Sequence, residues 1–228
     1  MAIILNIDTS IDTADVSLAK DGVLLMSEIN SEPKNHGSFL QLAIKRILAC
    51  TNTDINMLDA IAVANGPGSY TGLRVGLASA KGLCFTLNKP LLAINTLEIL
   101  AKASINQFPL NKDYLFCPMI DARRMEVFTA LYNHQLEQIL EPQAMILDDS
   151  SFNNQLETSK IVFLGNGSFK LKDIINHPNA IYSTIESQEK INAMITVAAE
   201  NYTSKNFHNL AYTEPYYIKD VFFAEKKK

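Results

Sequence analysis

The order of short apolar segments is the feature that most limits how this chain can fold. Residues 3–7 form an apolar run that ends at Asp8-Thr9-Ser10, which is typical of a buried strand entering a polar turn. Two more strand patterns, 16–19 and 23–29, flank Lys20-Asp21-Gly22, where the Asp-Gly pair favours a tight hairpin. The sequence therefore predicts three meandering strands at its start.

Helices and buried strands are then predicted to alternate up to residue 105. Apolar residues at helical spacing predict a helix over 37–50, with a stripe wide enough to face a core. Further elements alternate in type: a strand at 59–64, a helix at 71–87, a strand at 90–94 and a helix at 96–105. The predicted order of this half is βββαβαβα.

The second half repeats this order more loosely. Its predicted elements are strands at 114–120, 126–132, 136–140 and 161–164, a helix at 189–204 and an extended aromatic tail at 212–223. The polar turn at Asp121 mirrors the one at Asp8, and Gly165-Asn166-Gly167 mirrors Gly66-Pro67-Gly68. Pro109 lies in a predicted linker over 106–112. We expect two related α/β domains, 1–106 and 107–228, with the last segment packing back on the first.

Composition excludes several classes of protein. The chain has 228 residues, 47% of them hydrophobic, which is enough for a real core. A net charge of −4 argues against an autonomous nucleic-acid binder, so any RNA contact is expected to be shared with a partner. The three cysteines are far apart and lack C-x-x-C spacing, which indicates neither disulfides nor a zinc knuckle. Without a secretory signal or a long apolar span, we expect a cytoplasmic protein that contacts no membrane.

A glycine-rich block follows the fourth strand and leads directly into a helix. Asn65-Gly66-Pro67-Gly68-Ser69-Tyr70-Thr71-Gly72 could gather backbone N–H groups at the helix N-terminus, where anions bind. It lacks the Lys of a Walker A loop, and Thr71 stands where a dinucleotide motif has its third Gly. The alternative is a tight turn with close helix–strand packing, in which Ser69 or Thr71 is only an N-cap.

The acidic and basic residues at the strand ends allow two interpretations. Asp8 and Asp121 could hold Mg²⁺ or orient a water, or they could cap turns. Arg123 and Arg124 could grip a phosphate or a partner's carboxylate, or could simply be solvated. The four histidines are too scattered for a metal site, and Ser69 lacks the setting of a nucleophile elbow. The sequence therefore predicts no catalytic residue and no bound metal.

The helix predicted at 71–87 carries two apolar faces. Gly72, Gly76, Ala80 and Cys84 recur every four residues and form a groove that another helix could approach closely. The neighbouring face carries leucines at 73, 77 and 83. One of these faces is expected to be buried in the fold, and burial of the other against a second subunit is a hypothesis of equal weight.

Three blocks of this sequence resemble the bacterial TsaB family, formerly YeaZ: residues 7–10, residues 65–76 and Ile120-Asp121-Ala122-Arg123-Arg124-Met125-Glu126-Val127. The resemblance implies an actin-like (ASKHA, ribonuclease H-like) fold of two α/β domains. It also implies a role in forming threonylcarbamoyl-adenosine next to the anticodon of tRNAs that read codons beginning with adenosine. In that family the chain is a non-catalytic paralogue of TsaD, binds TsaD and helps recruit the ATPase TsaE.

The resemblance also implies ligands and surfaces. ATP and a metal are expected on the partner subunits, no cofactor on this chain alone, and tRNA contact only through the complex. The helices at 37–50 and 71–87 would form a four-helix packing with TsaD, or a homodimer in its absence. The expected interface residues are Phe39, Leu40, Ala43, Ile47, Gly72, Leu73, Gly76, Leu77, Ala80 and Cys84. Gly76→Arg or Ala80→Glu is then expected to abolish association and leave a soluble monomer.

Two other functions are weighed beside the scaffold. A former phosphate-binding loop would comprise Asp8, Thr9, Ser10, Gly66, Gly68, Ser69 and Thr71. If that loop were active, the chain would be a self-contained actin-fold ATPase or small-molecule kinase with Asp121 near Mg²⁺. A peptidase is suggested only by the family's old relationship to putative metalloproteases, and the scattered histidines count against it.

Overall fold

The first half of the protein is a five-stranded mixed sheet. A computed structural model of the chain describes residues 1–30, 32 and 36–219. The sheet has the order β3-β2-β1-β4-β5, with β1–β2 and β2–β3 antiparallel and β1–β4 and β4–β5 parallel. The strands are β1 (Ile3–Asp8), β2 (Ala14–Lys20), β3 (Val23–Asn30), β4 (Ala60–Gly66) and β5 (Leu91–Asn95). The helices are α1 (His36–Cys50), η1 (Ile55–Met57), α2 (Tyr70–Leu87) and α3 (Thr96–Gln107).

The second half repeats the topology of the first. Its sheet has the order β10-β9-β6-β7-β8, and read in reverse it again places three antiparallel strands beside two parallel ones. The strands are β6 (Leu115–Asp121), β7 (Glu126–Tyr132), β8 (Gln138–Ile146), β9 (Ile161–Leu164) and β10 (Ala180–Tyr182). The helices are α4 (Asn153–Thr158), α5 (Ser168–Lys172) and α6 (Ser187–Thr203). The predicted duplication of element order is confirmed.

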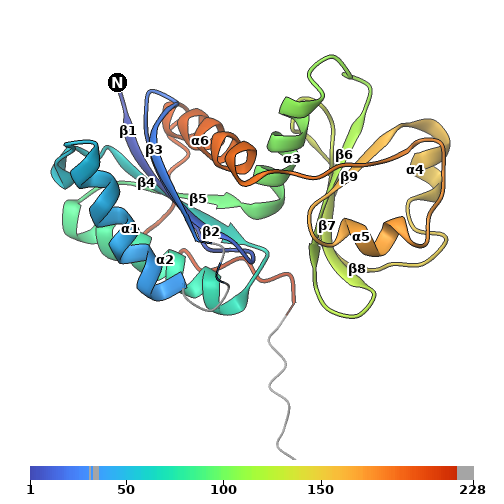
Figure 1. Ribbon diagram of the computed structural model, residues 1–228, viewed down its shortest axis with the longest axis horizontal. Coiled ribbons are helices and arrows are strands. Elements are labelled where there is room, and N and C mark those ends of the chain that lie inside the picture. Colours follow the sequence, from blue (N-terminus) through green and yellow to red (C-terminus); the bar gives the residue numbers. More distant parts are fainter. Residues whose placement is uncertain (31, 33–35, 220–228) are drawn as a thin grey trace, which may run out of the picture.

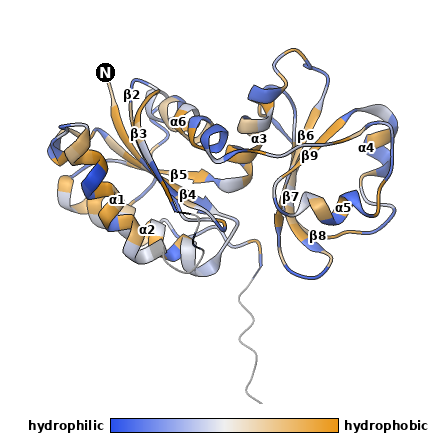
Figure 2. Ribbon diagram, viewed as in Figure 1, coloured by the Kyte–Doolittle hydropathy of each residue, from blue (hydrophilic) through white to orange (hydrophobic). Residues whose placement is uncertain are grey.

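Helices cover both faces of the first sheet (Figure 1). Strand residues alternate between the two faces, so Leu5 and Ile7 pack against α1 and α2, whereas Ile4 packs against α3 and α6. Figure 2 shows apolar residues running along α1 and α2 and through the strands. Helix α6 follows the second sheet in sequence but packs on the first, and α3 also contacts the second sheet through Leu97 and Leu100. The boundary between residues 106 and 107 stays a prediction.

Several element boundaries differ from the sequence prediction for local reasons. Strand β8 begins at Gln138 rather than Leu136, because Leu136 has φ 65° in the preceding turn. Helix α3 continues through Gln107 into the predicted linker. The short elements α4, α5 and β10 were not predicted, since each is too short to show a hydrophobic period. Residues 212–219 of the predicted tail carry no helix or strand, and 220–223 lie outside the described residues.

Helix α2 has a defined start and end. The Ser69 hydroxyl accepts a hydrogen bond from the Gly72 N–H at 3.3 Å, so Ser69 is the N-cap. Asn88 ends the helix in the left-handed conformation, at φ 52°. In the part of the chain that the structure describes, no helix combines the length and the apolar character needed to cross a bilayer.

Candidate functional site: the strand-end loops and the outer face of helices α1 and α2

The loop after β1 is sealed inside the protein. Asp8 Oδ1 accepts hydrogen bonds from the Ser10 N–H at 2.8 Å and the Ser10 hydroxyl at 2.6 Å. The Thr9 hydroxyl donates to the Gly72 carbonyl at 2.7 Å, and the Ser69 N–H donates to the Ser10 carbonyl at 2.6 Å. Asp8, Thr9 and Ser10 are all 0% exposed. In this arrangement none of these three side chains is open to solvent.

Close packing accounts for the glycines of the predicted phosphate loop. A Cβ atom at Gly68 would overlap the Ser10 carbonyl, and one at Gly72 would overlap the Thr9 carbonyl. Gly66 has φ 117°, and its Cβ would lie 2.5 Å from the Tyr216 carbonyl. These contacts support the alternative in which the glycine-rich block is a tight turn with close helix–strand packing. Phosphate binding by the loop residues, including Thr71, stays a prediction.

Asp8 belongs to a buried ion-pair triad that the sequence analysis missed. Lys190 Nζ from α6 lies 3.0 Å from Asp8 Oδ2 and 2.8 Å from Asp15 Oδ2, and all three side chains are at most 4% exposed. Burial alone would lower the pKa of Lys190, but the two carboxylates raise it. One sequence signal could have revealed the triad: Lys190 lies within the apolar stripe of the last helix, beside Ile191 and four residues before Met194.

The two carboxylates of the triad titrate differently. Burial would raise the pKa of Asp8, but the Lys190 charge and the Ser10 hydrogen bonds outweigh it and lower that pKa. Burial raises the pKa of Asp15 to about 6, against the opposing effect of Lys190. Two carboxylates share one ammonium, so one of them retains its proton more readily.

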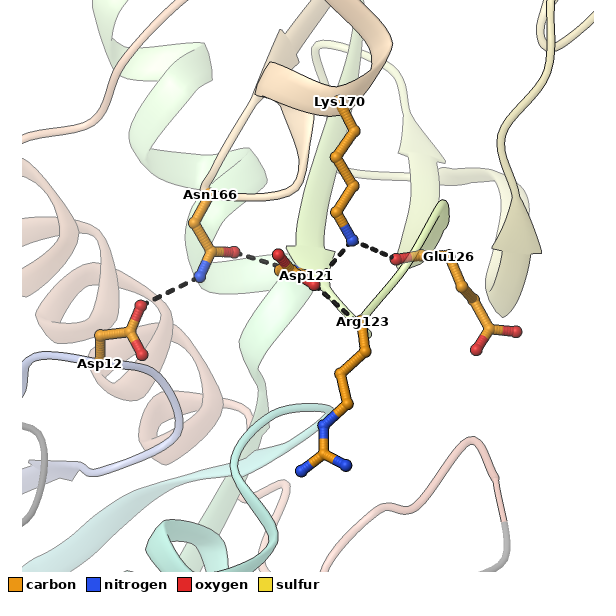
Figure 3. Close-up of polar contacts among 6 residues, drawn as sticks. All are labelled: Asp12, Asp121, Arg123, Glu126, Asn166 and Lys170. Atoms are coloured by element: carbon orange, nitrogen blue, oxygen red, sulfur yellow. Dashed lines mark hydrogen bonds and ion pairs between the residues drawn. The ribbon is translucent and has the colours of Figure 1, made fainter.

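Asp121 makes the matching turn in the second half (Figure 3), but its side chain is 44% exposed. Its Oδ1 accepts from the Arg123 N–H at 2.6 Å and from Lys170 Nζ at 2.7 Å, and Lys170 also donates to the Glu126 carbonyl at 2.9 Å. Slight burial would raise the pKa of Asp121, but these hydrogen bonds lower it. Both Asp8 and Asp121 therefore cap turns, one of the two alternatives that the sequence analysis left open.

The space between the two strand-end loops suits a polyphosphate poorly. Asn166 joins the loops, accepting from the Asp121 N–H at 2.9 Å and donating to Asp12 Oδ2 at 3.3 Å (Figure 3). Next to it lies a cavity of about 290 Å³, in which apolar side chains such as Leu100 and Phe169 alternate with polar ones that include the carboxylates of Asp12 and Glu186. Its one lysine, Lys190, is already paired. Across residues 1–30, 32 and 36–219, no three His, Cys, Asp or Glu side chains are grouped so that they could hold a metal.

The residues predicted for the helix interface face the protein's own core rather than solvent. Phe39 is half-buried, and the other nine are buried in the protein's own core: Leu40, Ala43, Ile47, Gly72, Leu73, Gly76, Leu77, Ala80 and Cys84. The small-residue stripe brings α2 against the β1–β2 loop, where a Cβ at Gly76 would overlap the Thr9 hydroxyl. Gly76→Arg and Ala80→Glu would therefore disrupt the fold, contrary to the prediction of a soluble monomer.

The opposite side of the two helices, here called the outer face, carries different residues. Leu42 and Phe85 are 55% and 81% exposed, Ala78 is also exposed, and a Cβ at Gly82 would meet no atom within 4 Å. Gln41 Nε2 donates to Ser79 Oγ at 3.1 Å and joins the two helices. The two apolar faces predicted for the helix at 71–87 thus both turn toward the core, and the exposed side of the helix pair consists of residues that the sequence analysis did not name.

A segment after α6, residues 207–219, lies beside α2 and is called the C-terminal strap. Lys81 Nζ donates to the Thr213 carbonyl at 3.0 Å, and the Tyr216 N–H donates to the Asn65 carbonyl at 2.8 Å. The Tyr217 and Tyr70 rings lie 5.3 Å apart. Lys219 then pairs with Glu126 at the start of β7 at 2.5 Å. The strap thus runs along one edge of the outer face and reaches the second half.

The buried cysteines are not poised as nucleophiles. Burial raises the pKa of the Cys84 thiol and of the Cys117 thiol to about 12. Both are therefore protonated at neutral pH, which leaves no reactive thiolate at either position.

Comparison with known proteins found a matching family model and several similar sequences. The family model described as "TsaD: tRNA N6-adenosine threonylcarbamoyltransferase" matches residues 25–223. The tRNA threonylcarbamoyladenosine biosynthesis protein TsaB of Bacillus subtilis is 35% identical over 175 residues, 75% of this chain and 74% of that protein. TsaB of Haemophilus influenzae is 28% identical over 243 residues, 95% of this chain and 93% of that one.

Solved structures support the fold. A Pseudomonas aeruginosa protein described as similar to peptidase YEAZ superposes with a TM-score of 0.81 at 24% identity, covering 96% of this chain and all of that one. A ROK family protein from Streptococcus pneumoniae gives a TM-score of 0.51 at 10% identity, covering 89% of this chain and 99% of that one. The duplicated α/β fold is therefore actin-like, and the chain belongs to the TsaB (YeaZ) family of the tRNA threonylcarbamoyladenosine biosynthesis pathway.

Proposed function

We propose that this chain is a non-catalytic subunit that binds TsaD through the outer face of α1 and α2 and helps recruit TsaE. The complex would form the threonylcarbamoyl group on adenosine next to the anticodon of tRNAs that read codons beginning with adenosine. ATP and a metal would be held by the partner subunits. The observation that carries the proposal is a set of exposed apolar and small residues on two adjacent helices, Leu42, Ala78, Gly82 and Phe85, that the protein's own core does not use.

The outer face has the chemistry of a helix-packing surface. Ala78 and Gly82 are exposed and small, so a partner helix could approach the α2 backbone closely. Leu42 and Phe85 offer large apolar side chains at the same surface, the type of anchor that dominates binding energy once water is excluded. A second helix pair laid on this face would complete a four-helix packing. In isolation the same face could support a homodimer.

The strand-end loops support a non-catalytic role. In an active phosphate site the groups at the strand ends must be free to meet a ligand. Here Asp8 and Asp121 are each neutralised by a lysine and bound to a turn N–H, and the Ser69 N–H donates to a protein carbonyl. These groups are therefore engaged within the chain.

The interface is tested by placing charge on the outer face without touching the core. Ala78→Arg and Gly82→Arg put a bulky cation where the structure has open space, so the fold should be retained while the cation must be desolvated at the contact. We expect sedimentation velocity to show loss of the one-to-one complex with TsaD from the same organism. Asn154→Arg, on the exposed face of α4, is the matched control and should bind normally.

Further measurements distinguish the proposed non-catalytic subunit from a self-contained ATPase. Undiminished TsaD binding by the doubly substituted chain would rule out this interface. Tight binding of Mg-ATP by the isolated wild-type chain, measured by calorimetry, would instead favour a self-contained kinase or ATPase. Addition of TsaE and ATP to the wild-type complex should extend it further, and failure to do so would remove the recruiting role.

A further inference from the structure

The turn between β6 and β7 presents two arginines in an unfavourable backbone conformation. Arg123 and Arg124 are both exposed and have φ values of 72° and 48°. Side chains other than Gly, Asn and Asp rarely occupy this left-handed region, because the Cβ atom crowds the backbone. Two successive arginines there are worse for the stability of the turn than Asn or Gly would be. A function of the side chains would explain their presence.

The carboxylates that flank the turn in sequence, Asp121 and Glu126, are already paired with lysines. Asp121 Oδ1 lies 2.7 Å from Lys170 Nζ, and Glu126 pairs with Lys219 of the C-terminal strap. Figure 3 shows the Arg123 guanidinium pointing away from both acidic groups. Among the described residues, neither guanidinium forms an ion pair or a side-chain hydrogen bond. The turn thus displays two free guanidinium groups beside two neutralised pairs, on a chain whose net charge is −4.

We propose that the Arg123–Arg124 turn binds the phosphodiester backbone of the tRNA when the chain is assembled with its partner. The inference deepens the proposed function and rests on it. Guanidinium groups form paired hydrogen bonds with phosphate oxygens and are always charged. Each phosphate contact also releases condensed counterions, which adds to the binding free energy. Contact with a single carboxylate at the rim of a protein interface brings no such release. The pathway to which the chain belongs acts on tRNA, so a polyanion is available.

The test removes the charge and relieves the backbone at the same time. Asn tolerates positive φ, so Arg123→Asn with Arg124→Asn should fold at least as well as the wild type. The probe is an unmodified tRNA transcript bound to the complex with TsaD, with affinity measured by fluorescence anisotropy at several salt concentrations. We expect about tenfold weaker binding near 0.1 M salt and a salt slope smaller by about two.

The control removes two positive charges elsewhere. Lys20 and Lys205 lie at the opposite end of the first sheet, and Lys20→Ala with Lys205→Ala should leave tRNA affinity unchanged. Unaltered affinity and slope in the arginine variant would overturn the proposal. So would weakened binding to TsaD with tRNA binding otherwise intact, because the arginines would then meet an acidic protein surface.

Failure of this proposal can be distinguished from failure of the proposed function. Sedimentation velocity first establishes whether the wild-type chain and TsaD associate, and absence of a complex would refute the proposed function. The same tRNA titration would then be run on the isolated chain. Weaker tRNA binding by the isolated arginine variant than by the isolated wild-type chain would support the phosphate site. Equal binding by these two chains, or no binding by either, would overturn the proposal.

Discussion

Asp8 and Asp121 occupy the same position in the two halves but lie in opposite environments. Each ends the first strand of its sheet, accepts the N–H two residues later and pairs with a lysine. The Asp8 side chain is 0% exposed and its Lys190 partner 4%, whereas the corresponding values for Asp121 and Lys170 are 44% and 17%. The duplicated topology therefore preserves the turn and the ion pair, but not their burial.

The difference follows from the helices that cover each loop. In the first half the 18-residue α2 packs on the loop through Gly72 and Gly76, and the 17-residue α6 supplies Lys190 from the other side. In the second half the lysine comes from α5, a helix of five residues that leaves the turn open. The first strand end thus contributes to stability, while the second remains available for contact with other molecules.

The largest expected effect on stability comes from replacing Lys190, and it is compared with the same replacement at Lys170. Lys190→Met would leave Asp8 and Asp15 buried without a cation, which should lower the free energy of unfolding by about 3–5 kcal/mol. Lys170→Met removes the exposed counterpart and should cost about 0–1 kcal/mol. Urea unfolding of both variants tests the comparison. Equal losses would show that burial does not distinguish the two strand ends.

The pH dependence of stability provides a second, smaller contrast. Burial raises the pKa of Asp15 from 3.8 to about 6, so between these pH values the folded protein holds a proton that the unfolded chain releases. The free energy of unfolding should therefore fall as pH rises from about 4 to 6, by at most about 3 kcal/mol from this group. Asp15→Asn should remove that fall.

The matched change at the second strand end should act in a different pH window. The pKa of Asp121 is lowered, so this group stabilises the fold above its unfolded pKa and loses its effect only as pH falls through its folded pKa, below 3.8. Asp121→Asn should leave the slope between pH 4 and 6 as in the wild type. Urea unfolding at closely spaced pH values measures both variants, and a slope that Asp15→Asn leaves intact would contradict the assignment to Asp15.

Periodicity and turn chemistry predicted the topology because they depend on local sequence. The strand ending at Asp8, the hairpin at Asp21-Gly22 and the helix beginning after Ser69 each have a signal within a few residues. The same local order allowed the duplication to be recognised, and three sequence blocks were sufficient to identify the family. Short elements such as α5 lack a period and were missed.

The site residues were harder to predict because burial depends on distant partners. A four-residue repeat of small residues identifies a face of α2 that something approaches closely, but it does not tell whether that is a partner or the protein's own loop. The structure shows that Gly76 faces Thr9, 67 positions earlier in the chain. The Asp8–Lys190 pair joins residues from the two ends of the sequence, which no local pattern could reveal.

The smallest expected effects compare two glycines on the same helix. Gly76 faces the first strand end, and its replacement by Ala would push a methyl group against the Thr9 hydroxyl, which is held by the Gly72 carbonyl. We expect a loss of about 1–3 kcal/mol in the free energy of unfolding. Gly82 lies on the outer face with no atom within 4 Å of its Cβ position, so Gly82→Ala should gain about 0.5–1 kcal/mol from helix propensity.

The two substitutions add the same methyl group to one helix. The opposite signs of their expected effects on the free energy of unfolding therefore depend only on which face of the helix receives that group. Thermal unfolding of the isolated chain is sufficient to measure them. If Gly76→Ala were neutral, the β1–β2 loop could yield to α2, and the sealed arrangement around Asp8, Thr9 and Ser10 would be less rigid than the contacts indicate. If Gly82→Ala were destabilising in the isolated chain, the outer face would already be covered, as a homodimer would require, and the loss should then decrease on dilution.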